Sequence, residues 1–261
     1  MTAALHRTPV YRRPADVPAT LGPCVLTIGV FDGVHRGHAH LIGHAVEAGR
    51  RRGLPTVLVT FDPHPARVLG LPRDTAGLST IEQRAELAGR LGVDAVCVLP
   101  FSAAFASRTP EEFASGVLAG SLRAAHVVVG GNFTFGHRGA GTTATLRELG
   151  ERLGFSVTVV DLLPITDRAA CSSTYIRTCL RDGDLAAANR ALGRPHQLEG
   201  DVAADGVFTA AHGTALPGPG TYEVLLPDGS SGILAAHSGR IRLHTNGPRP
   251  ARVVLRLVRR C

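Results

Sequence analysis

Apolar runs and amphipathic segments alternate over the first two thirds of the chain. The runs are short and rich in β-branched side chains, which is typical of strands buried on both faces of a parallel sheet. They cover residues 25–30, 54–61, 93–99, 125–130 and 155–160. The segments between them repeat apolar residues with the period of a helix. The expected helices cover residues 39–48, 79–91, 110–119, 142–154, 172–180 and 184–192.

Strands that alternate with helices form βαβ units, and these units require a parallel sheet. The pattern changes after residue 193. Four short strands separated by Pro, Gly and Asp turns are expected there, enough for a small antiparallel β-barrel. They cover residues 220–226, 232–236, 241–244 and 251–258.

The predicted fold is therefore α/β, with a Rossmann-like domain built on a parallel sheet and then a small, mostly antiparallel β-barrel-like domain. Residues 1–20 contain Pro9, Pro14 and Pro18 and are expected to form a surface lead-in. The larger domain is expected at residues 21–193 and the β domain at residues 194–261.

Composition indicates a globular protein. A chain of 261 residues that is 44% hydrophobic can bury one large core and one small one. Its first twenty residues are interrupted by Arg and Pro, and no apolar run is long enough for a bilayer, so a cytoplasmic location without membrane association is expected. The five cysteines lack C-x-x-C spacing, so neither a disulfide framework nor a zinc site is indicated.

All 28 basic residues are arginines, and the formal net charge is +7. The absence of lysine excludes a Walker-A phosphate site, a Schiff base and a lysine general base. The positive charge favours anionic ligands. The arginines are scattered, aromatic residues make up 5% of the chain and tryptophan is absent, so nucleic acid is not the expected partner.

The most informative stretch is G-V-F-D-G-V-H-R-G-H at residues 29–38, between the first expected strand and helix. Gly29 and Gly33 allow unusual backbone angles and a close approach by a ligand. The N-terminus of a helix presents unpaired amides and a positive dipole, which favour phosphate. His35 and His38, three residues apart, are expected to lie on one helical face and add charge there, with Gly37 keeping the surface between them low.

Two imidazole side chains that bind one phosphate suit nucleotidyl transfer, because negative charge spreads over the phosphoryl oxygens as the nucleotidyl group is transferred. Core or metal-binding histidines are the alternative reading for such a pair. The strand–turn–helix context and the glycines favour phosphate.

Three further stretches are candidates. T-F-D-P-H-P at residues 60–65 ends the second strand, where ligands collect in open α/β sheets, although a plain turn is the alternative. G-G-N-F-T-F-G-H-R-G-A-G at residues 130–141 can close over a planar ligand, or be a tight hairpin whose rings enter the core. S-S-T-Y-I-R at residues 172–177 can bind phosphate through hydroxyls and a guanidinium, or be an ordinary helix cap.

Together these stretches resemble the signatures of bacterial FAD synthetases, the adenylyltransferase module of the bifunctional riboflavin kinase/FMN adenylyltransferases. H-x-G-H alone marks the wider nucleotidyltransferase superfamily, but G-x-F-D-G-x-H-x-G-H, F-x-P-H-P, N-F-T-F-G-H-R-x-x-G and S-S-T-x-I-R are narrower. The resemblance is strong over about residues 21–200. One departure is Gly131, where the family commonly has an acidic residue.

The resemblance implies transfer of AMP from ATP to FMN, which gives FAD and pyrophosphate. The implied catalytic residues are His35, His38 and Arg177. The implied nucleotide-binding residues are Gly29, Phe31, Asp32, Gly33, Gly37, Ser172, Ser173 and Thr174. The implied flavin-binding residues are Asp62, His64, Asn132, Phe133 and Phe135. Mg²⁺ is expected to arrive with ATP and to keep several waters, so its protein ligands are not assigned.

The family's kinase domain carries a G-x-P-T-A-N motif soon after G-R-P-H-Q-L-E-G, but residues 194–261 contain no P-T-A-N. The β domain is therefore interpreted as a degenerate kinase-like module without riboflavin kinase activity. Two other functions stay open. One is a specialised nucleotidyltransferase for a modified flavin or another phosphorylated acceptor, with ATP or CTP. The other is a flavin- or nucleotide-binding regulator without catalysis.

Overall fold

The computed structural model describes residues 7–166, 169–237, 239–247 and 250–261. The chain divides into two compact units. The first consists of Met1–Arg73 and Ile81–Ala170, and the second of Asp74–Thr80 and Cys171–Cys261.

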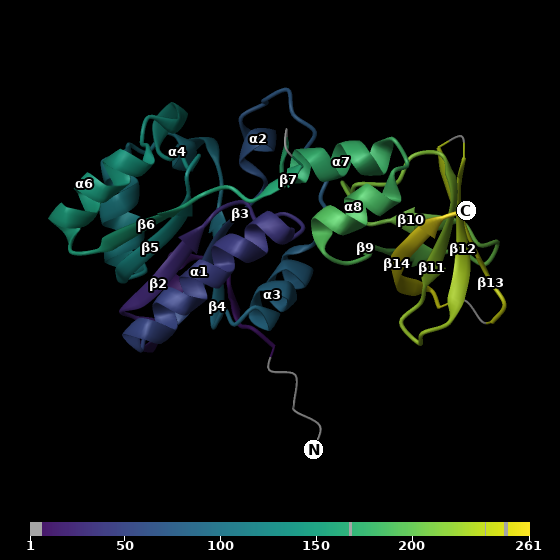
Figure 1. The fold of residues 1–261 in the computed structure, drawn as a ribbon, viewed down its shortest axis with the longest axis horizontal. Coiled ribbons are helices and arrows are strands. Elements are labelled where there is room, and N and C mark those ends of the chain that lie inside the picture. Colours follow the sequence, from purple (N-terminus) through teal and green to yellow (C-terminus); the bar gives the residue numbers. More distant parts are fainter. Residues whose placement is uncertain (1–6, 167–168, 238, 248–249) are drawn as a thin grey trace, which may run out of the picture. The chain divides into compact units, whose positions relative to one another are not determined.

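The first unit contains a parallel sheet of six strands (Figure 1). Their order in the sheet is β1-β4-β3-β2-β5-β6, which places β2 and β3 at its centre. The strands are β1 (Val10–Tyr11), β2 (Cys24–Ile28), β3 (Thr56–Asp62), β4 (Ala95–Pro100), β5 (Ala124–Gly130) and β6 (Ser156–Val160). The predicted α/β class and the five predicted strands of this unit are confirmed.

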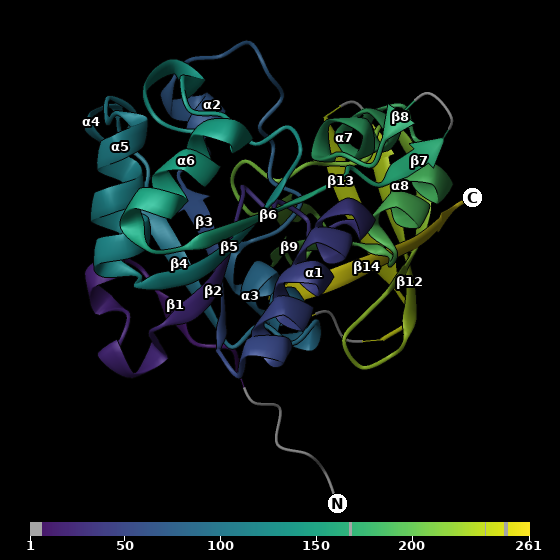
Figure 2. The ribbon, with the colours of Figure 1, turned by 60° about the vertical axis from the view of Figure 1, so that its left-hand side comes forward.

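Helices cover both faces of this sheet. Residues of α1 (Arg36–Arg52) and α3 (Ile81–Arg90) share core clusters with the side chains of one face, such as Leu58 and Val96. Residues of η3 (Phe113–Ser121) and α6 (Thr143–Leu153) share a cluster with those of the other face. Figure 2 shows α6 beside β5 and β6. Every residue of β2 is buried, which explains why all of them but Thr27 are apolar.

The predicted helix at residues 110–119 has a more unusual form. It begins as one α-helical turn, α5 (Pro110–Glu112), with a capping box between Thr109 and Glu112. It continues as the nine-residue π-helix η3, whose wider turns are closed by bonds such as that from the Leu122 amide to the Val117 carbonyl, 2.9 Å. Another short helix, α4 (Ala103–Ala106), precedes it.

The lead-in expected at residues 1–20 is partly built into the sheet. Val10 and Tyr11 pair in parallel with Val96 and Cys97, so β1 extends the sheet beyond β4. The 3₁₀ turns Pro14–Asp16 and Ala19–Leu21 follow, and Val17 between them is buried. Residues 1–6 of this expected segment lie outside the described part of the chain.

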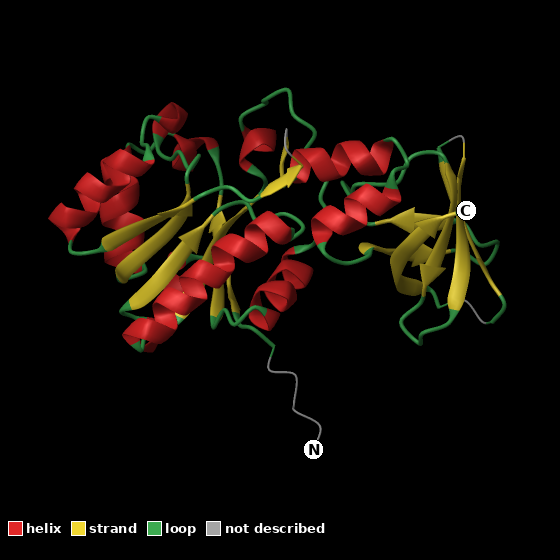
Figure 3. Ribbon diagram, in the orientation of Figure 1, coloured by secondary structure: helices red, strands yellow, loops and turns green. Residues whose placement is uncertain are grey.

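The second unit combines two helices with an antiparallel sheet of six strands, which form a nearly closed barrel (Figure 3). Its order is β10-β9-β14-β11-β12-β13, and a bridge between Val207 and Arg242 links the ends. The elements are α7 (Ser173–Arg181), α8 (Leu185–Leu192), β9 (His196–Val202), β10 (Phe208–Ala210), β11 (Gly220–Leu225), β12 (Ser231–His237), β13 (Arg240–Thr245) and β14 (Arg252–Arg260). The antiparallel β domain is confirmed, although β9 and β10 were not among the four predicted strands.

A short strap from the first half of the sequence belongs to this second unit. Residues 74–80 leave the first unit after α2 (Pro65–Val68) and return to it at α3. Within the strap, Gly77 forms a parallel bridge with Thr214: its amide donates to the Gly213 carbonyl, 2.6 Å, and its carbonyl accepts from the Ala215 amide, 2.8 Å. The second unit is therefore built from two separate segments of sequence.

The compact units differ from the expected domains, because α7 and α8 group with the barrel rather than with the parallel sheet. The boundary expected at residue 193 follows the pattern of the sequence instead of compactness, and it stays a prediction. A small hairpin of β7 (Pro164–Thr166) and β8 (Ala169–Ala170) ends the first unit. In the described part of the chain, no helix is both long and apolar enough to cross a membrane.

One buried polar cluster makes the first unit sensitive to pH. His126 on β5 is 2% exposed, with Nδ1 2.6 Å from the Ser156 hydroxyl and 3.3 Å from Nη2 of Arg52, and Nε2 3.1 Å from the Thr158 hydroxyl. Burial, followed by the charges of Arg52 and Arg51, lowers the pKa of His126 from 6.5 to about 4.

We expect this histidine to destabilise the protein as pH falls. Below about pH 6.5 the unfolded chain binds a proton at His126, whereas the folded protein binds it only near pH 4. The contribution of neutral, buried His126 to the free energy of unfolding is therefore present above pH 6.5 and is lost progressively below it. The full loss is about 3 kcal/mol. Urea unfolding between pH 7.5 and 5 should show a steeper loss for the wild type than for His126→Gln. Equal pH slopes would contradict this role.

Candidate active site

Three of the four candidate stretches follow adjacent strands of the parallel sheet. The turn at residues 29–35 follows β2, the loop at residues 130–141 follows β5, and T-F-D-P-H-P closes β3. Since β2 lies between β3 and β5, these loops emerge next to one another at the carboxyl edge. The strand order reverses between β2 and β5, which is where open α/β sheets bind ligands.

The turn after β2 is strained. Phe31 and Val34 have φ angles of 51° and 36°, and Gly33 between them has φ 80°. Positive φ is costly for a non-glycine residue, above all for a β-branched one. Gly29 also has a packing reason, since a Cβ there would lie 3.3 Å from the Phe31 ring. A hydrogen bond from the Val34 amide to the Phe31 carbonyl, 3.1 Å, closes the turn.

His35 is the N-cap of α1. Its Nδ1 accepts a hydrogen bond from the His38 backbone amide, 3.2 Å, which satisfies one of the free amides of the first turn. The helix then runs for 17 residues and ends at Gly53 in the left-handed conformation. The sequence reaches the helix N-terminus directly from the strained turn, so the amides and the positive dipole lie beside the glycines.

The two imidazoles of the turn are stacked. The rings of His35 and His38 have centroids 3.5 Å apart and planes 17° apart, and Phe31 packs edge-on against His38 at 5.2 Å. Because Nδ1 of His35 accepts a hydrogen bond in this arrangement, Nε2 is the nitrogen of this ring that can act as a donor. That both imidazoles add charge at this helix start stays a prediction.

The side chain of Asp32 is buried and points toward Arg84. Its side chain is 3% exposed, and Oδ1 lies 3.4 Å from Nη2 of Arg84. Arg84, from α3, is also buried and was not among the predicted site residues. A signal was present in the sequence, since Arg84 stands three residues after Ile81 and four before Ala88, on the stripe that should be apolar.

The second motif, T-F-D-P-H-P, has one exposed and one half-buried candidate side chain. Asp62 is exposed at the end of β3, and an oxygen of its carboxylate lies 3.8 Å from a guanidinium nitrogen of Arg12. His64 is the N-cap of α2, and its Nδ1 accepts from the Ala66 amide, 3.1 Å. At the start of both α1 and α2, the Nδ1 atom of a histidine thus accepts a hydrogen bond from a backbone amide.

The loop after β5 divides its residues between solvent and core. Asn132 is exposed, whereas Phe135 is 7% exposed and lies in the core cluster beneath η3 and α6. Phe133 is half-buried and stacks on Phe135 with planes 15° apart. Paired bonds between Phe135 and Gly141, 3.0 and 2.9 Å, make a narrow hairpin. For Phe135 the structure matches the alternative reading of a ring in the core, so this side chain supports the loop from beneath.

Six of the nine phenylalanines form a continuous series of ring contacts. Phe61 contacts Phe101 and Phe105, with centroids 5.7 and 6.4 Å apart, and the series continues through Phe113 to the loop after β5. Edge-on and offset ring pairs of this kind stabilise a core beyond the area they bury. The series joins the loops after β3 and β5 through the hydrophobic core.

The fourth motif lies in the second unit. Ser172 is the N-cap of α7 and accepts from the Tyr175 amide, 3.2 Å. Arg177 is 4% exposed, and its Nε donates to the carbonyl of Ala76 in the strap, 2.6 Å. Ser173 is half-buried and Thr174 exposed. Arg177 therefore has a structural contact that the motif alone did not predict.

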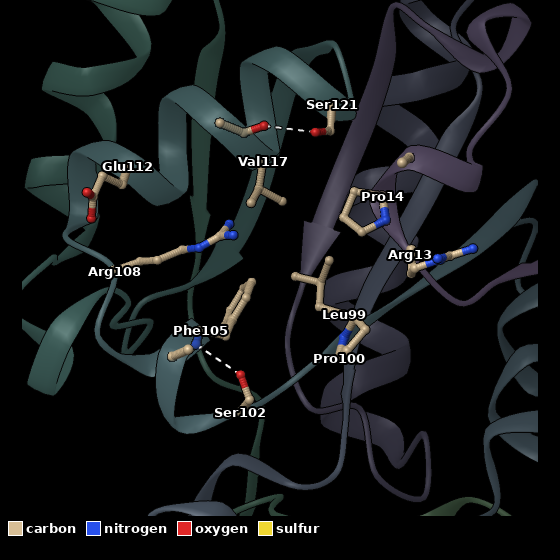
Figure 4. Close-up of a pocket in the computed structure, with 13 residues that line it drawn as sticks. Arg13, Pro14, Leu99, Pro100, Ser102, Phe105, Arg108, Glu112, Val117 and Ser121 are labelled. Carbon is tan, nitrogen blue, oxygen red and sulfur yellow. Dashed lines mark hydrogen bonds between the residues drawn. The ribbon is translucent and has the colours of Figure 1, made fainter.

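A cavity of about 740 Å³ lies elsewhere in the first unit, between the ends of β1 and β4 and the π-helix η3 (Figure 4). Leu99, Pro100, Phe105 and Val117 form its apolar wall, and the guanidinium of Arg108 lies 5.0 Å from the Phe105 ring. No predicted site residue lines this cavity. The candidate site is accordingly the carboxyl edge, which is defined by its loops.

No group of three or more His, Cys, Asp and Glu side chains could hold a metal ion within the residues that the structure describes. A magnesium ion that arrives on a triphosphate is held chiefly by phosphate oxygens and water and does not require such a group.

The parallel sheet with its reversal point, the capped helix after β2 and the imidazole pair are the features of a nucleotidyltransferase domain. Residues 17–175 match the FAD synthetase family, and the chain belongs to that family.

The chain is 38% identical over 180 residues to the bifunctional riboflavin kinase/FMN adenylyltransferase of Bacillus subtilis (strain 168), which covers 68% of this chain and 56% of the relative. It is 36% identical over 179 residues to the protein of the same name from Escherichia coli (strain K12), covering 69% of this chain and 57% of the relative. The match thus spans little more than half of each relative's length.

A solved structure shares the fold over nearly the whole chain. The structure titled as a macrolide-efflux protein from Streptococcus pneumoniae covers 98% of this chain and 91% of its own, with a TM-score of 0.83 and 23% sequence identity. At that identity the likeness concerns the fold alone.

The contact between Arg177 and Ala76 predicts that the strap depends on this side chain. In Arg177→Lys the ammonium cannot reproduce the Nε–H donor, and we expect unfolding to become easier by about 1.5 to 3 kcal/mol, the usual range for a hydrogen bond to a charged group. Limited proteolysis should cut residues 74–80 faster in the variant. Arg190→Lys, an exposed change on α8, is the matched control. Unchanged proteolysis of the strap would show that Arg177 does not hold it.

Proposed function

We propose that this protein is an FMN adenylyltransferase, which transfers AMP from ATP to FMN and releases FAD and pyrophosphate. The observation that carries the proposal is the stacked pair His35 and His38 at the start of α1, beside the reversal point of the sheet, in a chain of the FAD synthetase family. The cytoplasm is the proposed location.

In the proposed reaction a phosphate oxygen of FMN attacks the α-phosphorus of ATP. A new phosphorus–oxygen bond forms in line with the bond to the β-phosphate, which breaks, and its electron pair leaves with pyrophosphate. No covalent intermediate with the protein is needed. The protein's task is to position the two phosphates and to stabilise the charge that spreads over the transferred group.

His35 and His38 are the proposed donors to that group. Nδ1 of His35 accepts from the helix backbone, so the other ring nitrogen, Nε2, is the proposed donor to a phosphoryl oxygen. The dipole of α1 favours the same negative charge without reorganising. Gly29 and Gly37 let the nucleotide approach, and Asp32 acts by holding the turn.

For Ser172, Ser173, Thr174 and Arg177 we propose binding of the β- and γ-phosphates on the strength of the S-S-T-x-I-R motif. Mg²⁺ bound to ATP would neutralise phosphate charge in the same reaction.

The proposed acceptor site comprises Asp62, His64, Asn132 and Phe133, with Phe135 beneath them as support. FMN has a planar ring with a polar edge, which suits an exposed amide next to a half-buried aromatic side chain. The absence of P-T-A-N from residues 194–261 supports a barrel without riboflavin kinase activity. It also favours the second candidate, a nucleotidyltransferase for a modified flavin or another phosphorylated acceptor, with ATP or CTP.

Purified protein incubated with FMN, Mg²⁺ and each of the four nucleoside triphosphates in turn, with products separated by mass, tests the proposal. FAD should form from ATP, and riboflavin with ATP should give no FMN. His38→Ala should lose turnover far more than affinity for ATP, because its donor is stronger in the transition state. FMN formation from riboflavin would show that the barrel is an active kinase. A dinucleotide from CTP alone would favour the second candidate.

The acceptor site is tested at Asn132. Asn132→Ala should weaken FMN binding by about 1 to 3 kcal/mol, the usual range for leaving a polar partner unsatisfied, and should leave ATP binding nearly unchanged. Fluorescence titration with FMN and calorimetry with ATP measure the two separately. Thr134→Ala, an exposed change in the same loop, is the control. If the wild type shows no saturable FMN binding with an ATP analogue and Mg²⁺ present, FMN is not the acceptor.

A further inference from the structure

Arg84 is a buried cation in the first unit, next to the strained turn that follows β2. Its side chain is 7% exposed, and it extends from α3, whose neighbouring residues Ala85 and Ala88 pack in the core. A guanidinium withdrawn from water costs several kcal/mol unless its partners compensate for the lost hydration. The identity of those partners therefore indicates what the residue does.

The partners of Arg84 converge on the ends of two strands. Its Nη1 donates to the Val30 carbonyl, 2.7 Å, and to the Thr60 hydroxyl, 2.8 Å. Thr60, at the end of β3, donates in turn to the same Val30 carbonyl, 2.8 Å. Two donors thus fix one carbonyl, and both lie outside the turn that follows it.

The orientation of the Val30 carbonyl fixes the orientation of the Phe31 amide, because both belong to one planar peptide unit. In the trans peptide between Val30 and Phe31, the N–H of Phe31 points opposite to the Val30 carbonyl. Phe31 then adopts its positive φ of 51°, and one residue later the Asp32 carboxylate is held by Nη2 of Arg84 at 3.4 Å. Arg84 therefore fixes the strained turn at two successive points, before the chain reaches His35.

We propose that Arg84, assisted by Thr60, is a positioning residue for nucleotidyl transfer. It touches no substrate, and it sets the course of the backbone through residues 30–32 and thereby the position of the imidazoles that bind the transferred phosphoryl group. This inference rests on the proposed function. Since a displacement of about 1 Å can cost on the order of 100-fold in rate, a turn held at Val30 and Asp32 has a direct effect on turnover.

The geometry also explains why arginine stands at this position. One guanidinium reaches the Val30 carbonyl and the Thr60 hydroxyl through one nitrogen and Asp32 through another, in a fixed plane. An ammonium keeps the charge but has a single nitrogen. Arg84→Lys should therefore fail to restore the function of the arginine, although it keeps the buried charge opposite Asp32.

The experiment compares Arg84→Lys, Thr60→Val, the double variant and the control Arg90→Lys, an exposed change on the same helix. FAD formation gives kcat and KM for ATP, calorimetry gives affinity for a non-hydrolysable ATP analogue, and thermal unfolding gives the folded fraction. Arg84→Lys should lower kcat by about 10- to 100-fold and change KM for ATP by less than about 3-fold. Thr60→Val should have a smaller effect, and the double variant should resemble Arg84→Lys because both donors act on one carbonyl.

Each other outcome has a definite meaning. Wild-type kcat in folded Arg84→Lys would overturn the inference, as would a loss that appears in KM alone or follows the folded fraction. If Arg84→Lys does not fold, Thr60→Val decides, and its unchanged kcat would overturn the inference. A wild-type protein that makes no dinucleotide from any triphosphate would refute the proposed function itself, and the inference with it.

Discussion

The first unit depends on a strained backbone reversal that leads directly into the start of α1. Between β2 and α1 the chain must turn within seven residues and still bring the N-terminus of a helix, which favours an anion, to the edge of the sheet. The chain meets this demand with three residues at positive φ, of which Phe31 and Val34 are costly. Such a conformation persists only if its surroundings over-determine it, which here means a buried guanidinium before the turn and an imidazole cap after it.

Much of this architecture could be predicted from sequence because parallel strands buried on both faces are continuously apolar. All five predicted strands of the first unit are present, with small shifts at their ends. The missed strands have physical reasons. The edge strand β1 is two residues long, too short for any periodicity. In β9 the alternation of buried residues with more exposed ones is clear, but its sequence stands at the predicted domain boundary and overlaps the G-R-P-H-Q-L-E-G stretch.

The site was less predictable, because side-chain direction depends on tertiary contacts. Asp32 and Phe135 belong to motifs that suggest ligand contact, yet one is turned to Arg84 and the other into the core. Local sequence also cannot reveal that Arg177 reaches a strap about one hundred residues earlier in the chain. In this chain without lysine, arginine occurs both at the surface and at these buried positions. The buried positions require a planar guanidinium, which can donate to several acceptors at once.

The strap has a consequence for how the protein is made. Gly77 emerges from the ribosome long before Gly213 and Ala215, the residues that bond to it, and at ordinary rates of translation the delay is on the order of ten seconds. During that time residues 74–80 have no strand to pair with. The nascent chain must therefore carry this segment as an open loop, beside the exposed Leu69 and Leu71, until the barrel is complete. Until then this segment is one that chaperones and proteases can reach.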